Sequence, residues 1–296
     1  MIKSPLKRVV LIAGPTASGK SALAIAMARG ENGLVINADS MQVYSELRLL
    51  TARPSADEEA QAPHRLYGHV SGASAYSVAK WQREAMAEIE AAHEAGKLPV
   101  LVGGTGLYFM SLLKGLSKVP EISPEIREHW RNFAGDLHAE LAVRDAVSAT
   151  KLHPSDRQRL IRALEVVDST GRSLSHWQKV AEKDAPLRDY AVQKLFKSVQ
   201  RDELYARADR RFDQMMEQGA LNEVRNLPVL EAAAPLMKAI GVPELQAHLR
   251  GEISLELARQ KAKTATRQYI KRQLTWWRGQ MADWEEATPQ GAQTLL

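Results

Sequence analysis

The sequence predicts an α/β protein built on a parallel β-sheet that is flanked by helices. Three short apolar runs rich in β-branched residues, at 9–13, 34–38 and 99–102, are typical of buried parallel strands. Stretches of helical composition lie between them, at 21–29 and 77–96. Strands that alternate with helices favour an α/β sheet over an all-α or an all-β fold.

Strand signals are missing between residues 120 and 188, which indicates an all-helical insertion into the sheet domain. Ser123-Pro124 is typical of a helix start with proline at the first helical position, and 153–156 predicts another. Gly171 is the expected end of the second helix. A later strand is expected within 190–199. We therefore expect a core domain of residues 1–118 and 190–296, an insertion domain of residues 119–189, and a loose tail after Trp284.

Composition limits the class of protein. The 296 residues are 45% hydrophobic and 25% charged, which is enough for a sizeable core in one large or two ordinary domains. No apolar stretch approaches the length of a membrane span, so we expect a cytoplasmic protein without a membrane partner. The absence of cysteine excludes disulfides and thiolate metal sites. A net charge of +5 indicates a polyanionic partner only where the basic residues cluster.

Residues 14–21 read Gly-Pro-Thr-Ala-Ser-Gly-Lys-Ser, directly after the first expected strand and before the first expected helix. This is a phosphate-binding P-loop in its required context, which disfavours a glycine-rich turn without a ligand. The glycines let backbone N–H groups turn inward, and the helix start adds partial positive charge. Lys20 supplies a full charge to phosphate oxygens, and Ser21 a hydroxyl for Mg²⁺. The predicted phosphate-binding residues are Gly14, Pro15, Thr16, Ala17, Ser18, Gly19, Lys20 and Ser21.

Two further loops follow apolar runs, where parallel sheets bind their ligands. The first, residues 39–42, begins with Asp39, a candidate metal-orienting carboxylate or general base, with a helix N-cap as the alternative. The second, residues 103–106, contains three glycines and Thr105, the only side chain there that can donate a hydrogen bond. A plain tight turn is the alternative for this second loop.

Basic residues cluster near the C-terminus, where residues 259–281 contain no acidic side chain. Helical spacing brings several of them to one face. That face carries Lys263, Arg267, Lys271, Leu274 and Arg278. Because like charges four residues apart repel, an unpaired row of this kind indicates phosphates as partners, with a solvated basic face as the alternative.

Eight ordered motifs together resemble the bacterial tRNA dimethylallyltransferases, also called tRNA isopentenyltransferases, of the IPP transferase family. They are GPTASGKS at 14–21, NADSMQVY at 37–44, TARP at 51–54, PVLVGGTGLY at 99–108, DRQRLIRALEV at 156–166, RADRRFDQM at 207–215, KAIGVPEL at 238–245 and TRQYIKRQLTWWR at 266–278. The family transfers a dimethylallyl group from dimethylallyl diphosphate to the exocyclic amine of the adenosine 3′ to the anticodon, in tRNAs that read codons beginning with uridine.

The resemblance implies a role for each motif. The P-loop and Lys20 would hold the donor diphosphate with Mg²⁺ at Ser21, and no ATP is required. Asp39 would accept the proton of the adenine amine, and Thr105 would hydrogen-bond the bridging oxygen or the phosphates of the donor. Arginines are also expected at the diphosphate or the RNA backbone. These are Arg127, Arg207 and Arg211.

The target base must leave its stacked loop to reach the donor, so the resemblance implies a channel that donor and base enter from opposite ends. The expected tRNA contacts are Asp39, Ser40, Met41, Gln42, Thr105, Arg127, Gln158, Arg159, Leu160, Ile161, Arg162, Lys238, Gly241, Lys263, Arg267, Lys271, Arg272 and Arg278. Within this set, the apolar spacing of Leu160 and Ile161 favours a core role. A monomer is expected, because one RNA would engage both the insertion and the basic helix.

Three alternatives remain. An adenylate isopentenyltransferase would use the same chemistry on free AMP, but it needs neither the insertion nor the basic helix. A small-molecule kinase would use the P-loop for ATP and would need a flexible lid. A non-catalytic RNA-binding module would explain the basic helix but leave Lys20, Ser21, Asp39 and Thr105 without a purpose.

Overall fold

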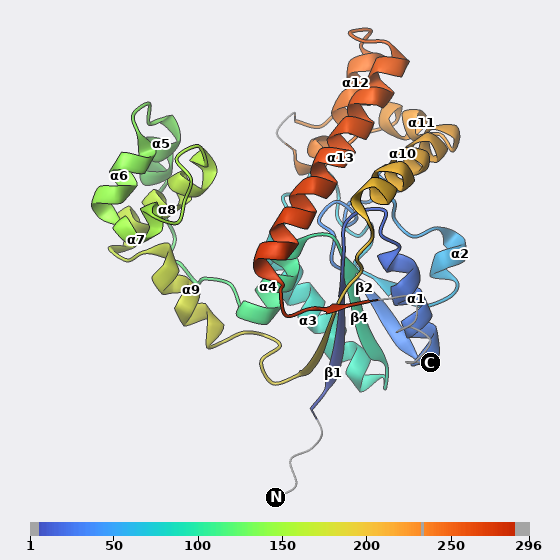
Figure 1. Ribbon diagram of the computed structural model, residues 1–296, viewed down its shortest axis with the longest axis horizontal. Coiled ribbons are helices and arrows are strands. Elements are labelled where there is room, and N and C mark those ends of the chain that lie inside the picture. The colour runs from blue at the N-terminus through green and yellow to red at the C-terminus, as the bar shows by residue number, and fades with distance from the viewer. Residues whose placement is uncertain (1–5, 232–233, 288–296) are drawn as a thin grey trace, which may run out of the picture. The chain divides into compact units, whose positions relative to one another are not determined.

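The computed structural model describes residues 6–231 and 234–287 (Figure 1). The chain divides into two compact units, one formed by Met1–Phe109 with Asp189–Leu296 and the other by Met110–Arg188. Among the described residues, none of the helices combines the length and the apolar character needed to cross a membrane.

The first unit contains one six-stranded sheet with the order β3-β2-β4-β1-β5-β6, in which every neighbouring pair is parallel. The strands are β1 (Arg8–Ala13), β2 (Gly33–Asn37), β3 (His64–Arg65), β4 (Leu98–Gly103), β5 (Ala191–Phe196) and β6 (Glu285–Glu286). Three of them coincide with the predicted apolar runs, and β5 lies within the expected segment 190–199. The prediction of a parallel α/β sheet is confirmed.

The expectation of a loose tail directly after Trp284 is wrong for the next two residues. Glu285 and Glu286 pair with Leu195 and Phe196 as edge strand β6. Trp284 itself is buried, and its ring packs against Phe109 and Trp277. The remainder of the predicted tail, 288–296, lies outside the described residues.

Helices cover the sheet because its central strands are apolar on both faces (Figure 1). Every residue of β1 from Val9 to Ala13 is fully buried. On one face Val10, Ile12 and Val100 pack with Ala24 and Met27 of the first helix. The helices of this unit are α1 (Lys20–Gly30), α2 (Ala56–Glu59), α3 (Val78–Glu94), α4 (Gly106–Lys114, which continues into the second unit), α10 (Arg201–Glu217), α11 (Ala220–Arg225), the 3₁₀ helix η1 (Pro235–Lys238), α12 (Val242–Leu249) and α13 (Leu255–Gln280).

Two further apolar clusters fix the helices that follow β5. Leu204 and Ala208 of α10 pack against Ile270 of α13. The N-terminal part of α13 and helix α12 pack on the loop after β2, where Tyr44 and Leu47 are buried. Helices α10 and α13 are therefore held side by side next to the carboxyl ends of the strands (Figure 1).

The second unit is built from the helices α5 (Pro124–Asn132), α6 (Leu137–Arg144), α7 (Ala146–Ala149), α8 (Arg157–Thr170) and α9 (Leu174–Glu182). Ser123 caps α5, Asp156 caps α8, and Gly171 ends α8 with a φ of 66°, as the sequence predicts. The core of this unit contains Trp130 and Leu160. Because Leu160 is only 1% exposed, its expected contact with RNA is wrong, and its apolar spacing indicated its role correctly.

Candidate active site

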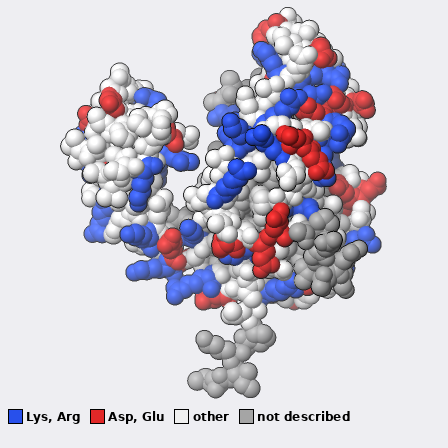
Figure 2. Space-filling model, viewed as in Figure 1, with Lys and Arg blue, Asp and Glu red and all other residues white. Residues whose placement is uncertain are grey.

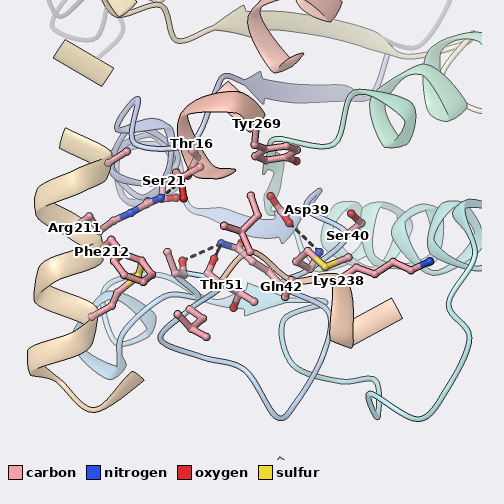
Figure 3. Close-up of a pocket in the computed structure, with 18 of the residues that line it drawn as sticks. Thr16, Ser21, Asp39, Ser40, Gln42, Thr51, Arg211, Phe212, Lys238 and Tyr269 are labelled. Atoms are coloured by element: carbon pink, nitrogen blue, oxygen red, sulfur yellow. Dashed lines mark hydrogen bonds between the residues drawn. The ribbon is translucent and has the colours of Figure 1, made fainter. Parts of the chain in front are cut away.

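A pocket of about 290 Å³ lies at the carboxyl ends of β1 and β2. Its wall is formed by loops and helices from the whole length of the first unit (Figure 3). These are the P-loop, the loop after β2, the segment 50–52, α10, η1 with the residues after it, and α13. Six segments of the chain therefore meet where a parallel sheet binds its ligands.

The P-loop joins β1 to α1 through a tight backbone path. Gly19 adopts a left-handed φ of 84° and precedes the first residue of α1, Lys20. The Lys20 amine donates a hydrogen bond to the Pro15 carbonyl at 3.2 Å, and Thr16, Lys20 and Ser21 line the pocket. The loop thus presents one amine and two hydroxyls at one end of the pocket, the P-loop end, next to the N-terminus of α1.

Arg211 of α10 reaches this same end of the pocket. It donates a hydrogen bond to the Thr16 hydroxyl, as the close-up shows (Figure 3). Arg207, one turn earlier, pairs with Glu203 and lines a more open hollow beside the P-loop. Arg127 lies exposed on α5 of the other unit. Of the three arginines expected near the diphosphate, the structure brings Arg211 into contact with the P-loop.

Burial sets the electrostatics of this end. The pKa of Lys20 falls from 10.5 to about 8, because burial lowers it more than Asp39 raises it and Arg211 adds to the decrease. Burial likewise lowers the pKa of Arg211, against the opposing influence of Asp39. Two enclosed cations thus face one carboxylate. This arrangement favours a ligand that brings additional negative charge.

Asp39 follows β2 and is held by its neighbours. Its backbone N–H donates to the buried Asn37 side chain at 2.8 Å, and its Oδ1 accepts a hydrogen bond from the Met41 N–H at 2.9 Å. This carboxylate oxygen stabilises a turn, so the alternative of a helix N-cap is wrong at this position. The other oxygen, Oδ2, faces Gly104, where an added Cβ would lie 3.3 Å away. Asp39, Ser40, Met41 and Gln42 all line the pocket.

Thr105 uses its hydroxyl within the protein. Its oxygen accepts from the Ser40 N–H at 2.9 Å, and its proton is directed to the Ser40 hydroxyl at 3.2 Å. Thr105 therefore ties the loop 103–106 to the loop after β2, beside the pocket lining. Its expected contact with the donor stays a prediction.

Several pocket residues were missed by the sequence analysis. Phe212 and Met215 of α10 and Leu50 add an apolar part to the pocket wall. Tyr269 lines the pocket, and burial raises its pKa. Helical periodicity could have indicated that Met215 lies on the side of α10 that carries Arg211, because the two are four residues apart; Phe212 lies three residues before Met215.

The expectation of an unpaired basic row on α13 is wrong for two of its residues, Lys263 and Arg267. Arg259 and Lys263 both pair with Asp213 at 2.7 Å, and Arg267 pairs with Asp209. The acidic partners come from α10, so basic and acidic side chains alternate over these two helices (Figure 2). The contacts expected between RNA and either Lys263 or Arg267 would have to compete with these carboxylates.

Other expected RNA contacts lie in different surroundings. Arg272 lines the pocket, and its guanidinium lies 5.7 Å from the centre of the Tyr269 ring, whereas Lys271 and Arg278 are exposed on α13. Lys238 lines the pocket with a side chain that extends away from Thr16 and Arg211 (Figure 3). Gly241 begins α12 with a φ of 97°, a conformation that favours glycine.

The helical unit carries a basic hollow of its own, which has a volume of about 560 Å³. Gln158, Ile161 and Arg162 of α8 line it with Arg131 and Arg157. The buried Glu165 lies 3.9 Å from Arg131 and 3.6 Å from Arg162. Arg159 points elsewhere and pairs with Asp156 at 3.4 Å.

Metal ligands are few at the candidate site. Within residues 6–231 and 234–287, no group of three or more His, Asp or Glu side chains could hold a metal ion. Ser21 and Asp39 nevertheless line one pocket beside two enclosed cations. A single hydroxyl with ligand phosphates and water suits Mg²⁺, which keeps several waters and seldom uses an all-protein cage.

The fold and this pocket define a P-loop protein in which the loop lies next to a carboxylate and an apolar wall. Residues 42–280 match the family described as IPP transferase, and the chain belongs to that family.

Curated relatives and solved structures agree with this family. The tRNA dimethylallyltransferase of Azorhizobium caulinodans is 51% identical over 96% of this chain and 93% of its own length. That of a Chelativorans species is 50% identical over 95% and 98%. The crystal structure of the full-length tRNA isopentenylpyrophosphate transferase from Bacillus halodurans has a TM-score of 0.69 and 33% identity over 98% of this chain and 94% of that one. A eukaryotic dimethylallyltransferase acting on tRNA has a TM-score of 0.79 and 32% identity over 92% and 70%.

Proposed function

We propose that this protein transfers a dimethylallyl group from dimethylallyl diphosphate to the exocyclic amine of the adenosine 3′ to the anticodon, in tRNAs that read codons beginning with uridine. The observation that carries the proposal is one pocket in which two enclosed cations, Lys20 and Arg211, lie at one end and Asp39 lies nearby. Family membership and the names of the relatives support the transfer of a prenyl group to tRNA.

The donor diphosphate would bind at the P-loop end. The Lys20 amine, the Arg211 guanidinium and the N-terminus of α1 together offset the charge that grows on the diphosphate as its bond to the prenyl carbon breaks. The apolar side chains of Leu50, Phe212 and Met215 suit the five-carbon group of the donor. The pocket thus combines a charged and an apolar part, as an amphipathic donor requires.

Asp39 would accept the proton of the adenine amine. The bond between the adenine nitrogen and the prenyl carbon forms, the carbon–oxygen bond of the donor breaks, and the proton of the amine passes to the carboxylate. Because the Met41 N–H holds Oδ1, Oδ2, which lies toward Gly104, is the candidate acceptor.

Mg²⁺ would be held by the Ser21 hydroxyl together with oxygens of the diphosphate. When bound, it would neutralise negative charge on the leaving group. Thr105 would contact the donor only after giving up its hydrogen bond to the Ser40 hydroxyl.

The tRNA would be held by both units. Lys238, Arg272, Lys271 and Arg278 offer positive charge on and near α13, and the basic hollow around Gln158 and Arg162 offers more on α8. Because the pocket is complete within one chain, we propose a monomer as the working form.

The variant Asp39→Asn tests the proposal, because it keeps the acceptor for the Met41 N–H but cannot take a proton at neutral pH. We expect turnover to fall by ~10²–10⁴-fold with tRNA affinity retained, measured by nucleoside mass analysis and by filter binding. The matched control is Asp57→Asn, on an exposed turn of α2. Undiminished turnover in Asp39→Asn would refute the role of Asp39 as the base.

A further inference from the structure

We propose that Gln273 is a positioning residue that fixes the distance between the two reacting ends of the pocket. Its side chain joins the P-loop to the loop 103–106, although 257 residues separate it from Thr16 and 169 from Gly104. The inference rests on the proposed function, since it assigns the diphosphate to the P-loop and the proton to Asp39, which Gly104 of the other loop faces.

Two hydrogen bonds define the bridge. Gln273 Oε1 accepts a hydrogen bond from the Thr16 N–H at 3.0 Å, and Nε2 donates one to the Gly104 carbonyl at 3.1 Å. The side chain is 6% exposed, so water does not replace these bonds readily. Strands β1 and β4 are directly paired up to Ala13 and Gly103. Beyond these residues the two strands end, and their loops separate. Gln273 bridges the loops just beyond the point where the sheet ceases to hold them.

Each partner of Gln273 touches a group of the proposed reaction. Thr16 accepts the hydrogen bond of Arg211 through its hydroxyl. Gly104 faces Asp39, because a Cβ added there would lie 3.3 Å from Asp39 Oδ2 and 2.5 Å from Gln273 Nε2. One amide therefore sets the separation between the cations at the diphosphate and the carboxylate that takes the proton.

Only a side-chain amide of this length satisfies both loops. The site needs an acceptor for an N–H and a donor for a carbonyl, which an amide supplies at fixed geometry. An ionised glutamate would place a carboxylate against the Gly104 carbonyl, and an asparagine is one methylene too short to reach both loops. Gln273 lies on α13 one turn after Tyr269, which lines the pocket, so the bridge also anchors this wall.

The expected consequence concerns the rate of transfer. The nitrogen, the prenyl carbon and the leaving oxygen must align, and a misplacement of about 1 Å costs ~10²-fold in rate. Loss of the bridge frees the Thr16 N–H to turn toward a phosphate, so affinity for the diphosphate has no reason to fall. We expect Gln273→Met to lower the single-turnover rate constant by ~30–100-fold, with dissociation constants for inorganic diphosphate and for tRNA changed by less than about threefold.

The test uses the full chain under single-turnover conditions with both substrates saturating, and it compares Gln273→Met with Gln260→Met. Gln260 is an exposed residue of the same helix that bonds Glu256, so it controls for the chemical change. The rate constant is independent of the folded fraction, which affects only the amplitude. A reduced rate constant with unchanged dissociation constants supports the inference. A normal rate constant with a reduced amplitude shows a merely structural role and overturns it.

Two further outcomes are decisive. If Gln273→Met does not fold, Gln273→Asn replaces it, and the same loss of rate at unchanged affinity is required. If the wild-type protein itself forms no product, the proposed function fails and the inference fails with it. A fully active wild type with an equally fast Gln273 variant overturns the inference alone.

Discussion

Replacing Lys20 by methionine should stabilise the ligand-free protein while removing its affinity for diphosphate. Burial lowers the pKa of Lys20 from 10.5 to about 8 in the folded chain. At ~1.4 kcal/mol per pKa unit, the folded state loses about 3 kcal/mol by holding this charge at neutral pH. Methionine has a similar length, but it gives up the hydrogen bond from the charged amine to the Pro15 carbonyl, which contributes about 1.5 kcal/mol. The net expectation is a gain of about 1.5 kcal/mol at pH 7.

The gain should disappear with rising pH. Below pH 8 both the folded and the unfolded wild-type chains keep the proton, so the full penalty acts. Between about pH 8 and pH 10.5 the folded chain releases it first, and the stability of the wild type rises because its unfolded state binds more protons. Methionine has no such dependence. The difference in unfolding free energy between variant and wild type should therefore approach zero near pH 10.

Urea unfolding at pH 7 and pH 10, followed by tryptophan fluorescence, measures this difference. Lys261→Met, at an exposed position of α13, is the control and should change stability little at either pH. Inorganic diphosphate should raise the urea midpoint of the wild type and of the control, but not that of Lys20→Met. A Lys20→Met protein that is less stable than wild type at pH 7 would refute the claim that this amine is held at a cost until an anion binds.

Three other substitutions test separate parts of the site. Arg211→Gln should weaken the binding of diphosphate by ~10-fold or more in titration calorimetry. Arg207 pairs with Glu203, so Arg207→Gln should change this affinity by less than about threefold. Equal losses in the two variants would contradict the assignment of Arg211. Gly103→Ala should destabilise the sheet unit severely, because the new Cβ would lie 2.0 Å from the Ala38 carbonyl oxygen, and thermal unfolding checks this against Gly279→Ala, where no atom lies within 4 Å. Leu160→Ala should lower the unfolding free energy of the helical unit by about 2–5 kcal/mol, measured by urea unfolding. A loss of tRNA binding without a loss of stability would contradict the core role and indicate that Leu160 contacts RNA.

Most of the sheet could be predicted because its central strands are continuous apolar runs, which is the pattern of strands that are buried on both faces. The edge strands β3 and β6 could not, because two residues are too short for a period of two to be detected. Helix ends were predicted where a local rule applies, as with Pro124 after Ser123 and Gly171 in the left-handed conformation.

The residues of the site, too, could be predicted only where the signal is local in the sequence. The P-loop is contiguous, so the sequence shows its residues together. Arg207 and Arg211 are four residues apart on one helix, and only the tertiary contact of Arg211 with Thr16 distinguishes them. The charge of α13 was misjudged because the partners of its basic residues, Asp209 and Asp213, belong to another helix. Local patterns carry no information about such distant pairs.

A competition between acceptors tests the central claim most directly. Purified protein is incubated with Mg²⁺, dimethylallyl diphosphate, unmodified tRNA and AMP together, and the nucleosides of both fractions are analysed by mass spectrometry. We predict that adenosine gains the mass of one dimethylallyl group in the tRNA fraction alone. Product on AMP, or the absence of product together with consumption of ATP in a parallel reaction, would contradict the account.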